Sequence, residues 1–171
     1  MLNFDFKKSS RKCYEDDKDF SPGDVFYSAL VELDDGDIER RDFCRDHWNE
    51  PGEDCVGWWK ARVPETGKGK IYWAPRNVLL SFFNHVLENP ETQDVAYVTA
   101  LVLVQKKILV IDDEPDRSFM RLRNRLDKTD YDVPVCDIEG DRLVRIQAEL
   151  AERLFMDEPI DETENEEADI D

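Results

Sequence analysis

Residues 24–33 read Asp-Val-Phe-Tyr-Ser-Ala-Leu-Val-Glu-Leu and lie between two turn sequences, Ser21-Pro22-Gly23 and Asp34-Asp35-Gly36-Asp37. β-Branched and aromatic residues fall at both odd and even positions of this stretch, which is typical of a strand buried on both faces. The second turn predicts a hairpin, with Ile38–Phe43 as the returning strand. This stretch therefore predicts a small antiparallel β module in the first part of the chain.

The chain after this hairpin predicts one more strand and then a linker. A polar corner at residues 45–54 contains Pro51-Gly52 and precedes a predicted third strand, Val56–Val63. Glycine and lysine dominate residues 65–70, which we interpret as a linker.

Two helices are predicted after the linker. Pro75 suits the first turn of a helix that runs to about Leu87 and carries one apolar stripe. Asn89-Pro90 ends it, and residues 91–105 form a second helix that is apolar on most of its surface. We expect this second helix to be the central element of a core.

The next segment predicts a small antiparallel sheet and a last helix. Ile108–Ile111 reads as a short strand, and residues 119–126 and 131–135 flank a turn and predict a hairpin. A final helix is predicted from Asp141, as its N-cap, to Met156.

These elements predict an α+β protein: a small antiparallel β module followed by two helices, a β-hairpin and a C-terminal helix. We expect five parts along the chain: a mobile N-terminal arm (1–11), an aromatic-rich three-stranded β module (12–64), the linker (65–70), an α+β module (71–156) and a disordered acidic tail (157–171).

The charge excludes one class of partner. The chain has 41 acidic and 23 basic residues, a net charge of −18, and residues 157–171 contain nine acids and no base. A chain this acidic is repelled by phosphate backbones, so nucleic-acid binding is disfavoured. Two interpretations of the tail remain open: a solubilising extension, or a segment that docks on the basic surface of a protein partner.

Two further patterns bear on location. The longest apolar run, Val95–Val104, is too short to span a bilayer, which takes about 20 apolar residues. The N-terminus shows no apolar secretory segment, so we expect a cytoplasmic protein with reduced cysteines and no membrane partner.

Cys13, Cys44, His47 and Cys55 form the one grouping whose residue types suggest a specific chemistry. Three thiolates and an imidazole could close a tetrahedral zinc site. Strong zinc signatures consist of pairs of close ligands, and only Cys44-x₂-His47 has that spacing. Buried apolar roles for these cysteines are the alternative, so zinc remains our second hypothesis and no cofactor the first.

Residues 107–115 resemble part of a known fold. Residues 107–115, Lys-Ile-Leu-Val-Ile-Asp-Asp-Glu-Pro, resemble the opening of a two-component receiver domain, whose first strand ends in a magnesium-binding acidic pair. That doubly wound fold needs more chain than the 65 residues that remain, and the predicted hairpin replaces its first helix. We therefore reject the receiver interpretation and expect an antiparallel sheet.

Tryptophan is concentrated in the first half of the chain. All four tryptophans and ten of the eighteen aromatic residues lie between Tyr14 and Trp73. Trp58 and Trp59 are adjacent on a predicted strand and must point to opposite faces, so one of them is the best candidate for an exposed contact with a partner.

Catalytic motifs are missing from the sequence. There is no G-x-S-x-G, P-loop, G-x-G-x-x-G or H-E-x-x-H sequence, and the chain has two histidines, His47 and His85. We name no catalytic residue. The leading hypothesis is a non-enzymatic, cytosolic protein-interaction or adaptor protein; the alternative is a small zinc-stabilised β module with a regulatory role, and a hydrolase or transferase comes third.

Cys13 and six further segments occur in a characteristic order: 21–30 (SPGDVFYSAL), 41–43 (RDF), 57–64 (GWWKARVP), 78–83 (VLLSFF), 97–104 (YVTALVLV) and 146–150 (IQAEL). Through these segments, residues 12–155 resemble an uncharacterised bacterial family of short cytosolic proteins. The resemblance implies no activity, cofactor or partner. Only the Cys13 position belongs to the pattern of that family; Cys44, His47 and Cys55 do not.

Overall fold

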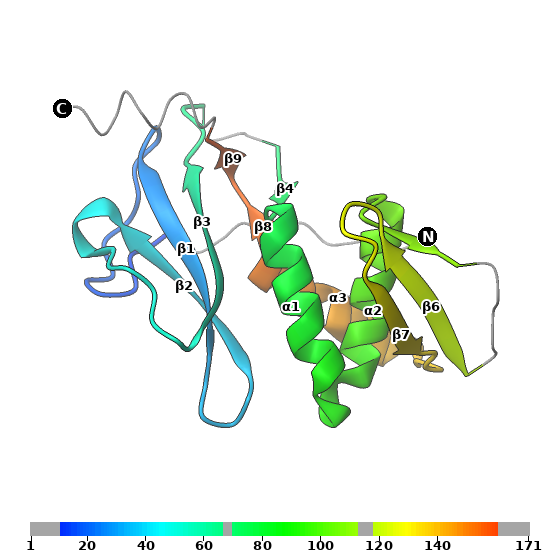
Figure 1. Ribbon diagram of the computed structural model, residues 1–171. Helices are drawn as coiled ribbons and strands as arrows, with labels where there is room; N and C mark the ends of the chain where they lie inside the picture. Colours follow the sequence, from blue (N-terminus) through cyan, green and yellow to red (C-terminus); the bar gives the residue numbers. More distant parts are fainter. Residues whose placement is uncertain (1–10, 67–69, 113–117, 161–171) are drawn as a thin grey trace. The chain divides into compact units, whose positions relative to one another are not determined.

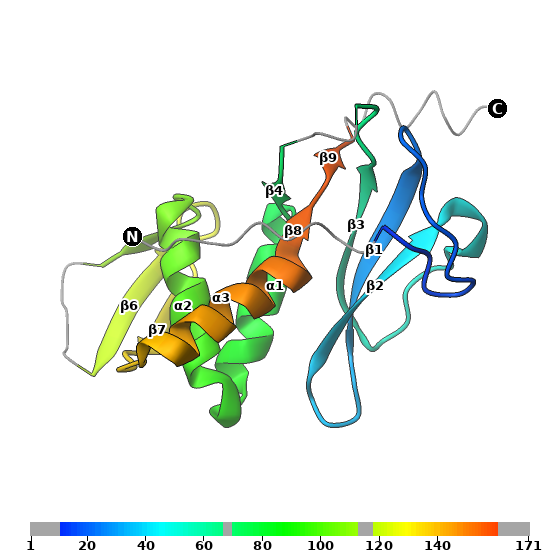
Figure 2. The same cartoon turned by 180° about the vertical axis from the view of Figure 1, so that it is seen from behind.

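The computed structural model describes residues 11–66, 70–112 and 118–160 (Figures 1 and 2). The described residues form two compact units, which we call the sheet unit (residues 11–66, 70–78 and 152–160) and the helical unit (residues 79–112 and 118–151). The boundaries between them fall inside two helices, α1 (Arg76–Glu88) and α3 (Gly140–Leu154). Antiparallel sheets and helices together confirm the predicted α+β class.

The sheet unit contains a four-stranded antiparallel sheet in the order β2-β1-β3-β9. Its strands are β1 (Val25–Glu32), β2 (Ile38–Cys44), β3 (Cys55–Arg62) and β9 (Glu158–Pro159). β1 is the central long strand, and six consecutive residues of it are buried, as its two-sided apolar pattern predicts. The β1–β2 turn contains Gly36 at φ +87°, a conformation that glycine adopts without steric cost.

The last described residues, 155–160, belong to the sheet unit, which the sequence did not indicate. α3 ends at Leu154, and residues Phe155–Met156 form strand β8, paired with β4 (Tyr72–Trp73). β9 then pairs with Ala61 and Arg62 of β3 (Figure 2). The predicted extension of the last helix to Met156 is therefore wrong.

The predicted start of the tail at residue 157 is also wrong. Asp157 is buried and receives a bidentate interaction from Arg11, with Nη2–Oδ1 at 2.8 Å and Nε–Oδ2 at 3.1 Å. Arg11, assigned to the arm, is thus fixed to the sheet unit. The expectations for the rest of the arm and for the tail after Ile160 lie outside the described residues, as does the centre of the linker.

A buried polar network connects β1, β2 and the chain after α3. Asp42 accepts hydrogen bonds from Ser28 Oγ at 2.6 Å and from Arg40 Nε at 3.2 Å. The Arg40 guanidinium also donates to the backbone carbonyls of Glu152 and Phe155 and lies over the ring of Trp59, 5.1 Å from its centroid. One arginine therefore holds the C-terminal segment against two strands.

The helical unit consists of most of α1, then η2 (Pro90–Thr92), α2 (Gln93–Gln105), a three-stranded sheet and most of α3. Its strands are β5 (Leu109–Ile111), β6 (Phe119–Asn124) and β7 (Asp130–Pro134), antiparallel in the order β5-β6-β7. The expected antiparallel sheet is confirmed, and α2 packs against its strands β5 and β7. An antiparallel β5 also agrees with the rejection of the receiver fold.

Two predicted helix starts need correction. Residues 90–92 form a 3₁₀ turn, and the α-helix begins at Gln93 because the Asn89 side chain caps the turn and Thr92 Oγ1 bonds back to the carbonyl of Val86. α3 begins at Gly140, so Asp141 lies in its first turn instead of capping it.

An ion pair joins α2 and α3 within the helical unit. Arg142 Nε donates to Asp94 Oδ2 at 2.8 Å, and both side chains are about one-third exposed. The hydrogen bond from Arg142 is the main cause that lowers the pKa of Asp94 below its ordinary value of 3.8.

None of the helices within the described ranges is both long and apolar enough to cross a membrane.

Arg40→Ala should destabilise the protein strongly. The substitution leaves the Asp42 carboxylate buried with only Ser28 among its present side-chain donors, and breaking a buried pair costs about 3–5 kcal/mol. Urea denaturation followed by circular dichroism measures the loss. Arg121→Ala is the control, because it removes an arginine from an exposed pair with Asp132, worth about 0.2–1 kcal/mol. Equal losses in the two variants would contradict the role given to Arg40.

Asp94→Asn should lower stability near neutral pH and not in acid. The folded-state pKa of Asp94 lies below its unfolded value, so its contribution is present above the unfolded pKa of about 3.9 and is lost as the pH falls through the folded value. Denaturant midpoints of wild type and variant should therefore converge in acid. In an Arg142→Gln background, the substitution should show much less pH dependence.

Candidate metal centre

The first half of the candidate site is a turn at the end of β2. Cys44 is the last residue of β2, and a single 3₁₀ turn, η1 (Arg45–His47), follows it directly. Side chains three residues apart eclipse one another in a 3₁₀ turn. The Cys44 Sγ and the His47 Nδ1 atoms consequently lie 3.1 Å apart.

The second half is a turn near the start of the described chain. Cys13 opens it, and its carbonyl accepts a hydrogen bond from the backbone of Asp17 at 2.8 Å, while its own N–H donates to Lys18 at 2.9 Å. Asp17 has φ +58°, which bends the backbone sharply. This turn places Asp16, three residues after Cys13, on the same side as the cysteine.

Backbone hydrogen bonds bring the two turns together. The N–H of Tyr14 donates to the carbonyl of Asp42 on β2 at 2.7 Å, and the N–H of Cys44 points at Cys13 Sγ at 3.5 Å. One ligand atom from each of Cys13, Asp16, Cys44 and His47 lies within 4.8 Å of the other three. The described residues contain no other group of three or more such side chains with this geometry.

Three of the contacts meet at one atom. His47 Nδ1 lies 3.5 Å from Cys13 Sγ, 3.1 Å from Cys44 Sγ and 3.6 Å from Asp16 Oδ2. A ring nitrogen carries one proton or one lone pair, so it cannot form three hydrogen bonds at once. Around a tetrahedral zinc, sulfur and nitrogen ligands are about 3.5 Å apart, given Zn–S of about 2.3 Å and Zn–N of about 2.0 Å. The contacts therefore correspond to edges of a coordination tetrahedron.

The same geometry argues against a cysteine protease type of triad. In a nucleophile–histidine–aspartate triad, the imidazole contacts the nucleophile with one ring nitrogen and the carboxylate with the other. Here Cys13 and Asp16 both approach Nδ1. The arrangement fits ligands around a common centre and not a proton relay.

The side chains of the cluster shift one another's pKa values. The pKa of His47 is raised above its ordinary value of 6.5, first by the hydrogen bond between His47 and Cys13 and then by the charge of Asp16. Burial raises the pKa of the Cys13 thiol, but hydrogen bonds from the backbone of Cys44, Glu15 and Asp16 lower it more. The pKa of Cys13 is therefore below its ordinary value of 9.0. Burial raises the pKa of Cys44. The cluster thus places the Asp16 carboxylate and a thiol of lowered pKa, that of Cys13, beside one imidazole.

The four side chains differ in their exposure. Cys13 is 1% exposed, whereas the Asp16 and His47 side chains are each 39% exposed and Cys44 is half-buried. Cys44, Asp16 and His47 line a cavity of about 410 Å³, together with residues such as Asp24 and Arg45. The cluster is therefore anchored in the protein at Cys13 and open to solvent on the other side.

Cys55 is not part of this cluster. It pairs with Val31 at the far end of β1, while Cys44 pairs with Phe26, and five residues of strand correspond to about 17 Å. Its thiol contacts the carbonyl of Gly57 at 3.3 Å. Of the four predicted ligands, the structure brings Cys13, Cys44 and His47 together and replaces Cys55 by Asp16.

Sequence reasoning missed Asp16, although a signal was present. Cys13-x₂-Asp16 has the same spacing as Cys44-x₂-His47, so the chain does contain two pairs of close ligands. With 41 acidic residues in the chain, a cysteine followed three residues later by an aspartate is unremarkable until the two turns are known to meet.

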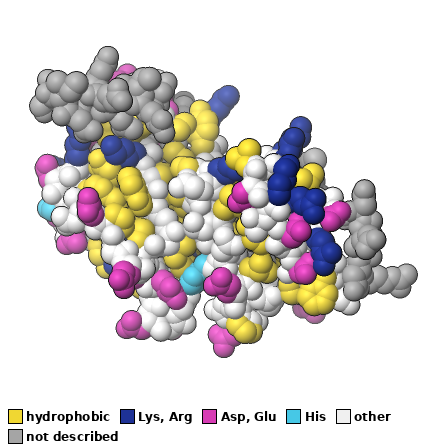
Figure 3. Space-filling view, in the orientation of Figure 1, with side chains coloured by type: hydrophobic (Ala, Val, Ile, Leu, Met, Phe, Trp, Pro, Cys, Tyr) yellow, Lys and Arg dark blue, Asp and Glu magenta, His cyan; other side chains and the backbone are white. Residues whose placement is uncertain are grey.

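Trp58 and Trp59 lie on opposite faces of β3, as expected. Trp59 is 3% exposed, and its Nε1 has no hydrogen-bond partner among the described residues. Trp58 is 41% exposed and joins a cluster of aromatic rings, 5.4 Å from Trp48 and 6.3 Å from Tyr27. Figure 3 shows hydrophobic side chains gathered on the surface of the sheet unit. Trp58 is therefore the exposed member of the predicted pair.

The aromatic cluster adjoins the candidate ligands along the chain. Tyr14 follows Cys13, Phe43 precedes Cys44 and Trp48 follows His47. Their ring centroids form a continuous series, with Tyr14–Phe43 at 5.8 Å, Phe43–Trp48 at 5.8 Å and Trp48–Tyr27 at 4.8 Å. The turns that present the ligands thus also position these rings.

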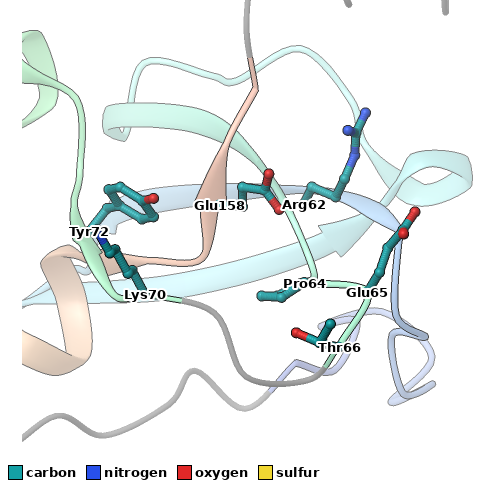
Figure 4. A pocket seen from close by; sticks show the side chains of 7 residues that line it. All are labelled: Arg62, Pro64, Glu65, Thr66, Lys70, Tyr72 and Glu158. Atoms are coloured by element: carbon teal, nitrogen blue, oxygen red, sulfur yellow. The ribbon is translucent and has the colours of Figure 1, made fainter.

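A second cavity of about 450 Å³ lies elsewhere in the sheet unit (Figure 4). Its lining side chains alternate in charge, with Arg62 and Lys70 against Glu65 and Glu158. It contains neither cysteine nor histidine, and it gathers no set of convergent donors comparable to that around His47.

Comparison of the chain with models of protein families, with curated proteins and with solved structures found no match. The geometry of the cluster of Cys13, Asp16, Cys44 and His47 is therefore what indicates a function.

Proposed function

We propose that the protein is a zinc-binding module in which Cys13, Asp16, Cys44 and His47 hold one ion. One observation carries the proposal: four donors from two separate turns converge within 4.8 Å, and three of the contacts share the single atom His47 Nδ1. Thiolate, imidazole and carboxylate are the usual ligands of zinc.

The ion would have a structural role. Four protein ligands complete a tetrahedral shell, as in structural zinc sites, whereas catalytic sites keep a position for water or substrate. Cys13 and Asp16 belong to the turn near the N-terminus, and Cys44 and His47 to the end of β2. The ion would therefore join the N-terminal turn to the sheet. A structural ion of this kind supports the hypothesis of a non-enzymatic protein.

The purified full-length chain should bind one equivalent of zinc, measured by mass spectrometry of the eluted metal. Cys44→Ser and His47→Ala should each lose most of the zinc. Zinc at about 100 times its dissociation constant should stabilise the folded state by about 2.7 kcal/mol, seen as a rise in the melting temperature that a chelator reverses. Cobalt in place of zinc should give a sulfur-to-metal charge-transfer band.

Cys55→Ser is the matched control, because it removes a half-buried thiol from the same sheet at the far end of β1. It should bind zinc as the wild type does. A wild type without stoichiometric metal, or a Cys55→Ser variant that loses zinc as Cys44→Ser does, would overturn the proposal.

Protein binding is a second candidate function, favoured by Trp58. Exposed tryptophan is enriched in interface hot spots, and this one lies beside Trp48 in the aromatic cluster next to the proposed ligands. With a net charge of −18, a partner with a basic surface fits best. The four free cysteines suit a reducing compartment such as the cytoplasm.

Trp58→Ala should weaken binding to such a partner by tenfold or more, while Val144→Ala should not change it. Val144 is also exposed, at 59%, and lies on α3 in the helical unit, outside the aromatic cluster. Affinity capture from the native cell, with each variant as bait, identifies a protein that depends on Trp58, and titration with that protein measures the loss. Equal capture by all three baits would contradict a role for Trp58.

A further inference from the structure

We propose that Cys44 is an oxidation site, which reacts with a hydroperoxide and then closes a disulfide with Cys13. The two sulfurs are already neighbours. Both contact His47 Nδ1, at 3.1 Å and 3.5 Å, and both belong to the group of atoms that lie within 4.8 Å of one another.

Access distinguishes the two cysteines. Cys13 is 1% exposed, so an oxidant in solution cannot reach its sulfur without local opening. Cys44 is half-buried and lines the 410 Å³ cavity with Asp16 and His47. A hydroperoxide that enters this cavity meets the sulfur of Cys44 first. Oxidation of cysteine follows both thiolate character and exposure. Cysteines that hold a metal ion are deprotonated, so in the zinc-bound protein both sulfurs would be thiolates and access decides between them.

The surroundings of Cys13 suit it to the second step. Its backbone is fixed by hydrogen bonds to Asp17 and Lys18, and the N–H of Cys44 points at its sulfur at 3.5 Å. A disulfide requires the sulfurs to approach to about 2.05 Å. The backbone N–H of Tyr14 donates a hydrogen bond to the carbonyl of Asp42 on β2, so the turn already holds Cys13 beside Cys44.

The chemistry balances with a hydroperoxide as the oxidant. The Cys44 sulfur attacks one peroxide oxygen, the O–O bond breaks, and hydroxide (or alkoxide) leaves, giving a sulfenic acid at Cys44. The Cys13 thiolate then attacks the Cys44 sulfur; the S–S bond forms, the S–O bond breaks, and hydroxide leaves. The two cysteines lose two electrons in total, the peroxide gains two, and solvent protonates the leaving groups.

The consequence for the metal rests on the proposed function. A disulfide removes two of the four ligands at once, and His47 and Asp16 alone are too few to hold zinc. The turn at Cys13 would remain joined to the end of β2, now by a covalent bond. Oxidation would therefore exchange a metal crosslink for a disulfide crosslink at the same place in the fold.

Limited hydrogen peroxide added to the reduced, zinc-loaded full-length protein tests the inference. We expect a mass loss of two hydrogens, a Cys13–Cys44 peptide in non-reducing digests, and release of one zinc to a chromogenic chelator, all reversed by dithiothreitol and zinc. With excess dimedone present during oxidation of the wild type, the adduct should map to Cys44. In Cys13→Ser the Cys44 adduct should accumulate, and in Cys44→Ser residue 13 should stay unlabelled.

Cys55 and Cys136 are internal controls, since each is half-buried and its thiol contacts a backbone carbonyl, that of Gly57 and Pro134. Dimedone labelling of Cys13 in preference to Cys44, or a disulfide that involves Cys55 or Cys136 at the same peroxide dose, would overturn the inference. Zinc that binds but stays bound after peroxide treatment would also overturn it, while leaving the proposed function intact. A protein that binds no zinc refutes the proposed function instead, and mapping of the Cys13–Cys44 disulfide still decides the oxidation chemistry.

Discussion

The sheet unit depends most on the contacts of the buried Arg40 guanidinium. This guanidinium contacts Asp42 on its own strand, Ser28 on β1, the ring of Trp59 on β3 and the carbonyls of Glu152 and Phe155 at the end of α3. A charge taken out of water must be paired and hydrogen-bonded, and this one is. The C-terminal segment consequently returns to the sheet, although more than 100 residues separate it from β2.

Two other arginines continue the same connection. Arg153 donates to the carbonyl of Ile38 and to Asp37 at the β1–β2 turn, and Arg11 holds Asp157 just before β9. In an acidic chain, ion pairs of this kind also neutralise carboxylates that would otherwise repel one another within the fold. The ends of the described chain are thereby both fixed to the four-stranded sheet, and the turn at Cys13 lies next to one of those fixed points.

The candidate metal centre follows from this arrangement. β2 places Cys44 and, after one 3₁₀ turn, His47; the hydrogen bond from Tyr14 to Asp42 places Cys13 and Asp16 beside them. Asp42 therefore contributes twice: its side chain bonds to Arg40 in the interior, and its carbonyl receives the N-terminal turn. The candidate ligand Cys44, the ring of Phe43 and the buried Arg40–Asp42 pair lie on the same strand, β2, so changes in one are expected to reach the others.

Local patterns determined most of the secondary structure. The two-sided apolar pattern of residues 25–32, the Gly36 turn and the stripe on α1 are properties of neighbouring residues, and the structure contains the elements that they predict. The sequence also indicated that the sheet around Ile108–Ile111 is antiparallel, because residues 119–135 have the pattern of a hairpin and the 65 residues from Lys107 onward are too few for a doubly wound receiver fold. Within the site, it identified Cys13, Cys44 and His47 by residue type alone.

Only the tertiary structure decided the rest, because those features depend on contacts between residues far apart in the chain. β8 and β9 have two residues each and no pattern of their own; they are strands because β4 and β3 offer free edges to them. Asp16 is one carboxylate among 41 acidic residues, and Cys55 fits a zinc site by type as well as any other cysteine. What separates them is distance: the backbone bond from Tyr14 to Asp42 brings Asp16 to His47, while the register of β3 keeps Cys55 at the opposite end of the sheet.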